Sequence, residues 1–317
     1  MTGPHSPPEP APAAGDRPRA GTGSATGPAV GLFDSGLGGL SVLRALRALA
    51  PGLPVHYHAD QARVPWGPRP VIELRGYCAA ISAALQAQGC GTLVLACNTA
   101  SAAALHWLRA QQPGTPFVGM EPAIKPAAQR SRSGIVGLLA TPATLAGELL
   151  AQTRARYAPE LQILSDPCTG LVDAIEARDE AAVAALLAGI VPPMVRAGAD
   201  VLVLGCTHYP FALDTIRALA GPRVEVIDPA PAVAAQVLRV LPATQRAALA
   251  EAAPCAPRLS TSGDVTLFAT RARALLGLAP QAALEVSARD WAGQPPASSA
   301  TPGASSAPAR AASPPPD

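Results

Sequence analysis

The sequence is poor in aromatic and charged residues, and it lacks long apolar runs. Aromatic residues make up 3% of the 317 residues and charged residues 15%, with a formal net charge of +2. So small a charge provides no extended positive surface for nucleic acid. No stretch approaches the roughly 18 uninterrupted apolar residues of a membrane-spanning helix, and residues 1–20 lack the apolar segment of a secretory signal. These absences predict a cytoplasmic protein without nucleic-acid or membrane partners.

Lysine and paired cysteines are also scarce, which argues against the usual cofactors. Lys125 is the only lysine and lies in a proline-flanked segment without a phosphate-binding loop, so a Schiff base to pyridoxal phosphate is poorly supported. The 6 cysteines form no CxxC pair and no tight disulfide spacing, which favours reduced thiols. His56 with His58, and Cys206 with His208, each lack a third metal ligand nearby. We predict no cofactor and no metal.

Against this background, one pattern occurs twice: an apolar run that ends in a cysteine and two polar residues. The first copy is Leu-Val-Leu-Ala-Cys-Asn-Thr over 93–99, and the second is Leu-Val-Leu-Gly-Cys-Thr-His over 202–208. Such runs are typical of central parallel strands, and open α/β sheets bind ligands at the carboxyl ends of their strands. Buried cysteines are common in cores, but a core does not require the polar pairs. We therefore predict that Cys97 and Cys206 face one cleft.

A third strand end carries a glycine-rich turn. The predicted strand over 29–33 is followed by Asp34 and by glycines at 36, 38 and 39, which lead into a helix. Helix N-termini offer free N–H groups to anions, yet Asp34 would repel a phosphate. A small substrate with both an ammonium and a carboxylate group fits this turn better, and a simple capping role for Asp34 is compatible with that function.

Strands and helices alternate along the chain, which predicts parallel sheets. We expect two similar parallel-sheet α/β domains in pseudo-twofold relation, with the active site in the cleft between them. A single helix is expected over 142–154, and a last strand over 284–286. The predicted organisation is a disordered tail at 1–28, one domain at 29–119 plus 228–292 with Asp34 and Cys97, a second at 120–227 with Cys206 and His208, and a disordered tail at 293–317.

Two facing thiols suit the inversion of a carbon that carries a hydrogen. Inversion requires removal of a proton from one face and return of a proton to the other face, which two acid/base groups achieve more readily than one. A cysteine thiolate is accessible from an ordinary pKa of about 8.5 by a modest shift. The polar pairs after Cys97 and Cys206 would bind the ammonium and carboxylate groups of the substrate.

These residues resemble the bacterial glutamate racemases, cofactor-independent enzymes that supply D-glutamate for peptidoglycan and so for cell wall biogenesis and cell shape. The resemblance spans roughly residues 30–290, and the two cysteine motifs make it specific. The matching segments are Gly-Leu-Phe-Asp-Ser-Gly-Leu-Gly-Gly-Leu-Ser at 31–41, Ala-Cys-Asn-Thr-Ala-Ser at 96–101, Glu-Pro-Ala-Ile-Lys-Pro at 121–126 and Gly-Cys-Thr-His-Tyr-Pro at 205–210.

The resemblance implies a role for each site residue. Cys97 would be the base for the D-enantiomer and Cys206 the base for the L-enantiomer. Asp34 and His208 would assist the two thiols, and Glu176 would be an acidic residue near the second thiol, although its flanking segment matches loosely. The implied substrate contacts are Asp34, Ser35, Trp66, Gly67, Asn98, Thr99, Thr207 and His208.

One substrate contact departs from the family pattern. The family usually has Pro-Tyr-Gly where this chain has Pro65-Trp66-Gly67. A contact through the Gly67 backbone would survive this change, whereas one through a tyrosine hydroxyl would not.

Two alternatives remain open at this point. The first is a two-thiol racemase for aspartate or a hydantoin, although the Thr-His-Tyr-Pro run after Cys206 favours glutamate. The second is a regulatory protein, since some racemases of this family are thought to inhibit DNA gyrase. The expected partner is a small-molecule substrate, glutamate, and the resemblance leaves a homodimer open.

Overall fold

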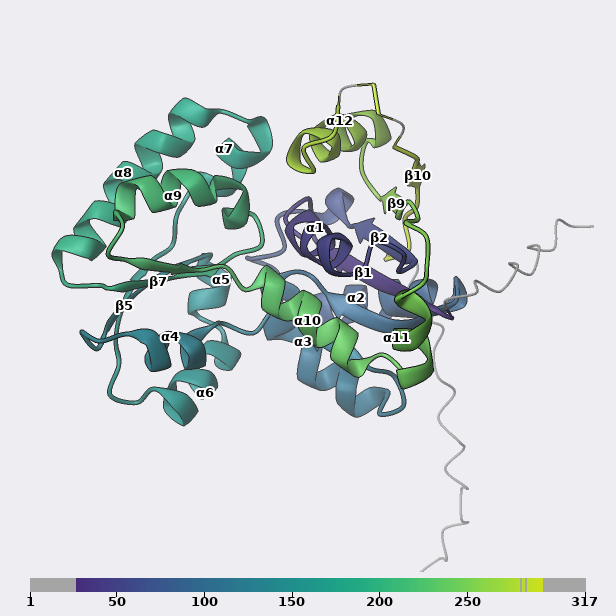
Figure 1. Ribbon diagram of the computed structural model, residues 1–317, viewed down its shortest axis with the longest axis horizontal. Helices are drawn as coiled ribbons and strands as arrows, with labels where there is room; N and C mark the ends of the chain where they lie inside the picture. The colour runs from purple at the N-terminus through teal and green to yellow at the C-terminus, as the bar shows by residue number, and fades with distance from the viewer. Residues whose placement is uncertain (1–26, 280, 283, 293–317) are drawn as a thin grey trace, which may run out of the picture.

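The computed structural model describes residues 27–279, 281–282 and 284–292, which form two lobes, each built on a parallel sheet (Figure 1). One sheet has 6 strands in the order β10-β9-β2-β1-β3-β4, and the other has 4 strands in the order β6-β5-β7-β8. The strands are β1 (Ala29–Asp34), β2 (Val55–Ala59), β3 (Cys90–Leu95), β4 (Phe117–Gly119), β5 (Ile135–Ala140), β6 (Gln162–Asp166), β7 (Val201–Gly205), β8 (Glu225–Ile227), β9 (Arg258–Thr261) and β10 (Val286–Ala288).

Helices connect these strands and cover the sheets. No helix among the described residues is long and apolar enough to cross a membrane. The helices are α1 (Leu40–Leu49), η1 (Gln61–Arg63), α2 (Val71–Ala87), α3 (Asn98–Gln111), α4 (Ile124–Arg130), α5 (Pro142–Leu145), α6 (Glu148–Tyr157), α7 (Leu171–Ala177), α8 (Glu180–Arg196), η2 (Tyr209–Ala212), α9 (Leu213–Ala220), α10 (Ala230–Val240), α11 (Ala243–Leu249) and α12 (Val265–Leu275).

The two sheets repeat one topology. The order β2-β1-β3-β4 recurs as β6-β5-β7-β8, with every pairing parallel. The register repeats as well, because Gly31 of β1 pairs with Leu93 of β3, and Gly137 of β5 pairs with Leu202 of β7. A Cβ atom at either glycine would lie within 2.8 Å of the leucine side chain beside it, so each position needs glycine. The predicted parallel α/β sheets are therefore present, and they share one strand plan.

The carboxyl-terminal segment adds β9 and β10 to the first sheet, beyond β2. β9 was not predicted from the sequence, because its four residues include Arg258 and two hydroxyl side chains rather than an apolar run. The predicted strand at 284–286 is displaced, because the observed strand is Val286–Ala288. The domain boundaries drawn from the sequence stay a prediction.

The helix predicted over 142–154 is wrong as a single element. The structure has two helices, α5 and α6, separated at Gly147, whose backbone is extended (φ −74°, ψ 139°). Glycine is a poor helix former, with a cost of about 1 kcal/mol relative to alanine, so a break at this position is inexpensive.

The chain termini are only partly covered by the described residues. The predicted tails at 1–28 and 293–317 lie outside them, except for residues 27 and 28. The carbonyl oxygen of Pro28 accepts a hydrogen bond of 2.7 Å from Nε2 of Gln245 in α11. Residue 28 is thus attached to the folded part of the chain, one residue before the predicted start of the first strand.

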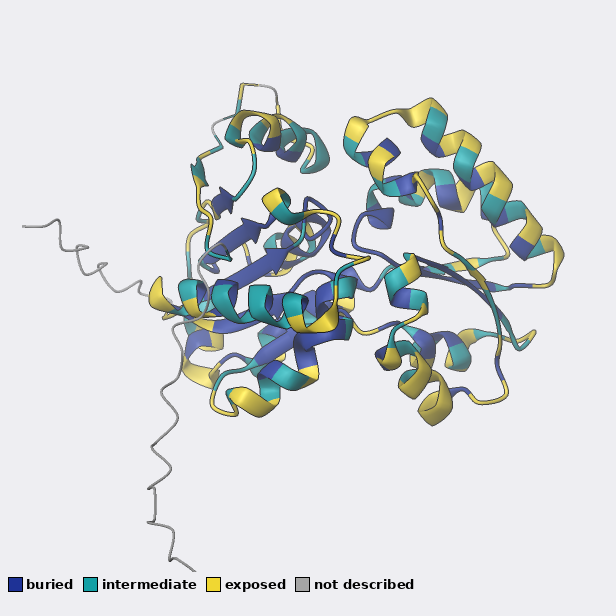
Figure 2. Ribbon diagram, turned by 180° about the vertical axis from the view of Figure 1, so that it is seen from behind, coloured by how far each residue is buried: buried dark blue, intermediate teal, exposed yellow. Residues whose placement is uncertain are grey.

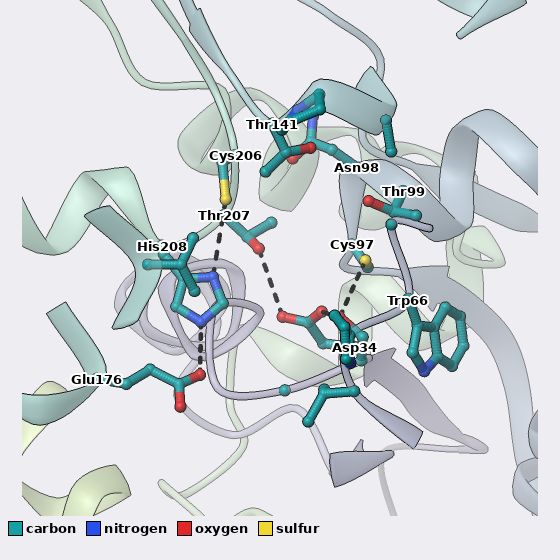
Figure 3. A pocket seen from close by; sticks show the side chains of 18 of the residues that line it. Asp34, Trp66, Cys97, Asn98, Thr99, Thr141, Glu176, Cys206, Thr207 and His208 are labelled. Atoms are coloured by element: carbon teal, nitrogen blue, oxygen red, sulfur yellow. Dashed lines mark hydrogen bonds and ion pairs between the residues drawn. The ribbon is translucent and has the colours of Figure 1, made fainter. Parts of the chain in front are cut away.

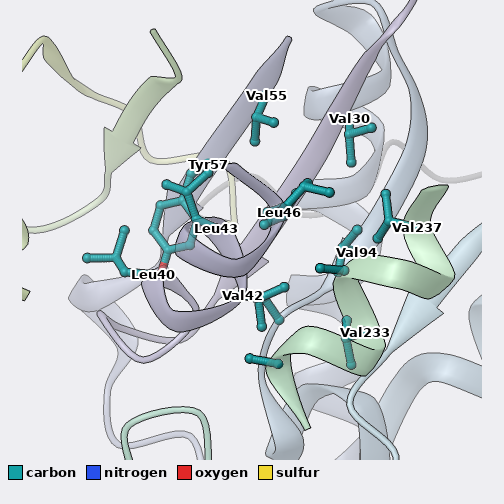
Figure 4. Close-up of a cluster of buried hydrophobic side chains, with 14 of the residues drawn as sticks. Val30, Leu40, Val42, Leu43, Leu46, Val55, Tyr57, Val94, Val233 and Val237 are labelled. Carbon is teal, nitrogen blue, oxygen red and sulfur yellow. The ribbon is translucent and has the colours of Figure 1, made fainter. Parts of the chain in front are cut away.

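Helix α1 is buried against the first sheet through one apolar face. The central strands β1, β3, β5 and β7 are buried along most of their length, whereas β6, β8 and β10 at the sheet edges are mostly intermediate or exposed (Figure 2). The apolar residues of α1 recur every three residues, as expected for a helix with one buried face, and Leu40, Leu43 and Leu46 are fully buried. They pack against β1, β2 and β3, beside Val233 and Val237 of α10 (Figure 4). Each such side chain contributes about 1.5–3 kcal/mol by its burial.

Candidate active site

A cavity of about 490 Å³ lies between the two sheets, at the carboxyl ends of β1, β3, β5 and β7. It contains every site residue predicted from the sequence, although these come from both halves of the chain. Figure 3 shows side chains from both lobes around it. The predicted residues that line it are Asp34, Ser35, Trp66, Gly67, Cys97, Asn98, Thr99, Glu176, Cys206, Thr207 and His208.

Cys97 follows β3 and caps the amino end of α3. Its Sγ accepts a hydrogen bond from the backbone N–H of Ala100 at 3.4 Å and lies 3.5 Å from Oγ of Ser35. The thiol is 5% exposed. Its burial, followed by the charge of Asp34, raises the pKa of Cys97 well above its ordinary value, although the contacts with Ala100 and Ser35 oppose this shift. Cys97 is therefore a thiol rather than a thiolate at neutral pH.

Asp34 links the two halves of the site. Its carboxylate is 1% exposed and accepts hydrogen bonds from the backbone N–H of Gly39 and from the hydroxyl of Ser35 at 3.2 Å. A third bond, 3.4 Å long, comes from the hydroxyl of Thr207, which follows β7 in the other lobe. Buried polar groups are normally paired in this way. Asp34 thus holds the glycine turn and also contacts the second cysteine motif.

The surroundings of Cys206 differ from those of Cys97. Sγ of Cys206 lies 3.7 Å from Nδ1 of His208, and Nε2 of the same ring lies 2.9 Å from Oε1 of Glu176. Burial lowers the pKa of His208, but the contacts with Cys206 and Glu176 outweigh burial and raise it to about 10. His208 is therefore an imidazolium at neutral pH, and its charge can stabilise negative charge on the adjacent sulfur.

The charge of His208 predicts a loss of stability at alkaline pH. Its pKa is raised from 6.5 to about 10 in the folded protein, so the stabilisation is fully present below about pH 6.5 and is lost as the pH rises toward 10. We expect the thermal unfolding midpoint of the native protein to fall more between pH 7 and pH 10 than that of His208→Asn. Parallel pH curves for the two proteins would contradict this assignment.

Trp66 lines the cavity with its ring. The side chain is buried, its ring centroid lies 5.7 Å from that of Tyr77, and its indole nitrogen has no hydrogen-bond partner among the described residues. A Cβ atom at the neighbouring Gly67 would be in van der Waals contact, at 3.6 Å, with Cβ of Ala143, which also lines the cavity. Trp66 therefore places a buried aromatic ring beside the cavity, which the neighbouring Gly67 also lines.

Several residues that line the cavity were not predicted from the sequence. Thr141 and Ala143 follow β5, and Asp173 lies on α7. Thr141 obeys the same rule as the other site residues, because it is polar and directly follows a buried parallel strand, so this signal could have found it. Asp173 lies inside a short helix, where no local pattern distinguishes it from a solvated residue.

The described residues contain no group of three or more His, Cys, Asp or Glu side chains placed to hold a metal ion. His56 and His58 of β2 are both buried, and Nδ1 of His58 lies 3.0 Å from the hydroxyl of Ser260 in β9. Burial lowers the pKa of both histidines, that of His58 to about 3. These histidines are neutral residues of the first lobe and do not line the cavity.

The glycine turn after β1 fits closely against the second cysteine motif. A Cβ atom at Gly38 would lie 2.3 Å from Oγ1 of Thr207 and 2.5 Å from Nδ1 of His208. We expect Gly38→Ala to displace these side chains and to lower turnover by at least about tenfold, since small misplacements of reacting groups are costly. Gly76→Ala in α2, where a Cβ atom meets nothing within 4 Å, is the control and should leave kcat unchanged. Wild-type kcat in Gly38→Ala would refute this close fit.

Comparisons with known proteins agree with this geometry. A family model described as Asp/Glu/Hydantoin racemase matches residues 40–237. A glutamate racemase from a Roseiflexus species is 53% identical over 67% of this chain and 79% of the relative. One from Ectopseudomonas mendocina is 46% identical over 78% of this chain and 94% of the relative.

Solved structures show the same architecture. A glutamate racemase isoform from Bacillus anthracis covers 83% of this chain and 97% of its own, with a TM-score of 0.73 and 28% identity. The Escherichia coli glutamate racemase, solved with L-glutamate and the activator UDP-MurNAc-ala, covers 79% of this chain and 94% of its own, with a TM-score of 0.68 and 31% identity. These likenesses confirm the predicted fold class of two parallel-sheet α/β domains in pseudo-twofold relation.

The fold and the shared cavity thus define an α/β enzyme of the amino-acid racemase class. The chain belongs to the Asp/Glu/hydantoin racemase family. The prediction of a racemase from the two cysteine motifs is confirmed at this level.

Proposed function

We propose that the protein interconverts L-glutamate and D-glutamate without a cofactor, with Cys97 and Cys206 as the two bases. The observation that carries this proposal is that two thiols, at equivalent ends of the equivalent strands β3 and β7, line one cavity. Two acid/base groups on opposite sides of a ligand are what inversion at a hydrogen-bearing carbon requires.

The protonation of Cys97 and His208 favours a starting state in which Cys206 acts as the base. The pKa of Cys97 is raised by burial, while the imidazolium of His208 lies beside Cys206. Cys206 would therefore remove the α-proton of L-glutamate as a thiolate, and Cys97 would return a proton to the opposite face as a thiol. The reverse reaction exchanges these roles, so D-glutamate would meet Cys97 as the base.

The lining of the cavity also fits an amino acid. Among the described residues that line it there is no lysine or arginine, so carboxylates must be bound by N–H and hydroxyl groups. The amino end of α3 at Asn98 and Thr99 offers such groups, as does Thr207. The carboxylate of Asp34, buried between the two cysteine motifs, would bind the substrate ammonium.

Glutamate is favoured over the other substrates of the family by the relatives described above, whose names specify glutamate. We infer that the product D-glutamate serves peptidoglycan synthesis, and so cell wall biogenesis and cell shape, in the cytoplasm. This inference is supported by the Escherichia coli neighbour, because its activator UDP-MurNAc-ala is a muramyl nucleotide.

Purified protein should convert L-glutamate and D-glutamate into the same racemic mixture without an added cofactor. Chiral chromatography and circular dichroism measure the conversion, and L-aspartate tests the alternative. We expect kcat/KM for glutamate to exceed that for aspartate by at least about tenfold, since one methylene group allows this degree of discrimination. Dialysis against a chelator should not change the rate. Turnover of aspartate alone, or activity restored only by zinc, would overturn the proposal.

A further inference from the structure

Arg271 is joined to the site although it does not line the cavity. It lies on α12, and its Nη1 is 3.1 Å from Oε2 of Glu176 on α7. The other carboxylate oxygen of Glu176 lies 2.9 Å from Nε2 of His208, whose Nδ1 is 3.7 Å from Sγ of Cys206. One carboxylate therefore connects Arg271 to the ring beside the second thiol, as Figure 3 shows from Glu176 onward.

The two ends of this chain of contacts belong to different lobes. α12 is anchored on the first sheet by Phe268, which is fully buried and stacks with Tyr57 of β2 at a centroid distance of 6.4 Å. Glu176, by contrast, belongs to α7, which packs on the second sheet through Leu171 and Ile175. Figure 1 shows α12 and α7 at the facing edges of the two lobes. The Arg271–Glu176 pair therefore crosses from one lobe to the other.

A second contact from the first lobe reaches the same carboxylate. The backbone of Leu37, in the turn after β1, hydrogen-bonds to Glu176, and these contacts with His208, Arg271 and Leu37 outweigh burial and lower the pKa of Glu176. Two groups of the first lobe thus hold an acid of the second lobe in place. Separation of the lobes would release that acid and, with it, the partner of His208.

We propose that Arg271 is a positioning residue: by holding Glu176 from across the cleft, it keeps His208 oriented toward Cys206. This role rests on the proposed function, because it concerns the thiol assigned to L-glutamate. Arg271 itself does not line the cavity, so its effect is indirect. It also makes the site dependent on closure of the two lobes, since the orientation of His208 is complete only when α12 and α7 are in contact.

Substitution of Arg271 tests this role through the turnover of L-glutamate. Arg271→Met should lower kcat for L-glutamate by roughly tenfold or more, because a misplaced catalytic group is costly, and Arg271→Lys should restore part of it. The primary isotope effect with α-deuterated L-glutamate should rise in Arg271→Met. The matched control is Arg273→Gln on the same helix, since Arg273 contacts the carbonyl oxygen of Ala282 instead. Wild-type kcat in Arg271→Met, or an equal loss in Arg273→Gln, would overturn the proposal.

An NMR titration of the His208 ring separates this proposal from the proposed function, because it needs no turnover. The charged and titratable groups that face the ring are Cys206, Glu176 and Asp34, with Arg271 behind Glu176. If Arg271 positions Glu176, the carboxylate moves away from the ring in Arg271→Met, and the pKa of His208 falls below about 10. If Arg271 acted only as a nearby positive charge, its removal would raise that pKa. An unchanged or raised pKa would refute positioning, whether or not the protein racemises glutamate.

Discussion

Cys97→Ala should abolish racemisation but leave one enantiomer able to exchange its α-proton with solvent. Without Cys97 no group on its side can return a proton, so inversion should slow by several powers of ten, each equal to about 1.4 kcal/mol of barrier. Cys206 keeps its contact with His208 and can still remove the proton of L-glutamate and return a solvent-derived one to the same face. The expected product in deuterium oxide is therefore α-deuterated L-glutamate without D-glutamate.

The corresponding substitution of the second thiol provides the strongest control. In Cys206→Ala we expect the same loss of racemisation, with exchange confined to D-glutamate. Proton NMR measures exchange, and chiral chromatography measures inversion. Cys90→Ala tests a buried cysteine at the start of β3, far from the carboxyl end of that strand; it should cost on the order of 1 kcal/mol of stability and leave kcat nearly unchanged. Near-normal turnover in Cys97→Ala would falsify the two-base mechanism.

His208→Asn should give the second-largest effect, a fall in turnover of about 10²- to 10⁴-fold, which is typical of the loss of one acid/base group. The variant keeps a hydrogen-bonding side chain but loses the positive charge that lies 3.7 Å from Cys206. Because the equilibrium constant between enantiomers is one, kcat/KM must fall equally in both directions. The difference between the two sides must be measured in kcat for each enantiomer and in primary isotope effects.

The isotope effects should be unequal. A step made harder at Cys206 becomes more rate-limiting, so the effect with α-deuterated L-glutamate should rise more than that with the D-enantiomer. Asp34→Asn is the companion variant, because Asp34 contacts both cysteine motifs through Ser35 and Thr207 and should affect both directions. Identical isotope effects for both enantiomers in His208→Asn, with an unchanged kcat ratio, would show that His208 only positions the substrate.

Much of the site could be predicted because it follows a local rule. Cys97 and Cys206 each end a buried parallel strand, and the period and composition of such strands are visible in the sequence. Thr141 obeys the same rule and was overlooked only because no cysteine marks it. The resemblance to a family supplied Glu176, which lies on α7, inside a helix, where no local pattern distinguishes it.

The remainder depends on contacts between distant parts of the chain. Arg271 meets Glu176 only because α12 returns to the first lobe and faces α7. The residues of β9 have only a weak strand pattern of their own. They form a strand because they pair with β2 on one side and with β10 on the other. The break at Gly147 reflects a choice between one helix and two, which the surrounding structure decides. Tertiary context therefore explains each of these misses.

The repeated strand plan of the two sheets has a consequence for stereochemistry. A chain of L-residues cannot contain two halves that are mirror images, yet a racemase must treat mirror-image substrates alike. A rotation by 180° about an axis in the plane of a planar carbanion exchanges the two faces of the carbanion. Two protein halves related by such a rotation can therefore present equivalent groups to both faces, although the halves are not mirror images. Under the proposed mechanism, the duplicated strand ends at β3 and β7 deliver a thiol to each face. Any difference in how the two enantiomers are handled then arises from the different residues that follow the two cysteines, Thr99 after Cys97 and His208 after Cys206.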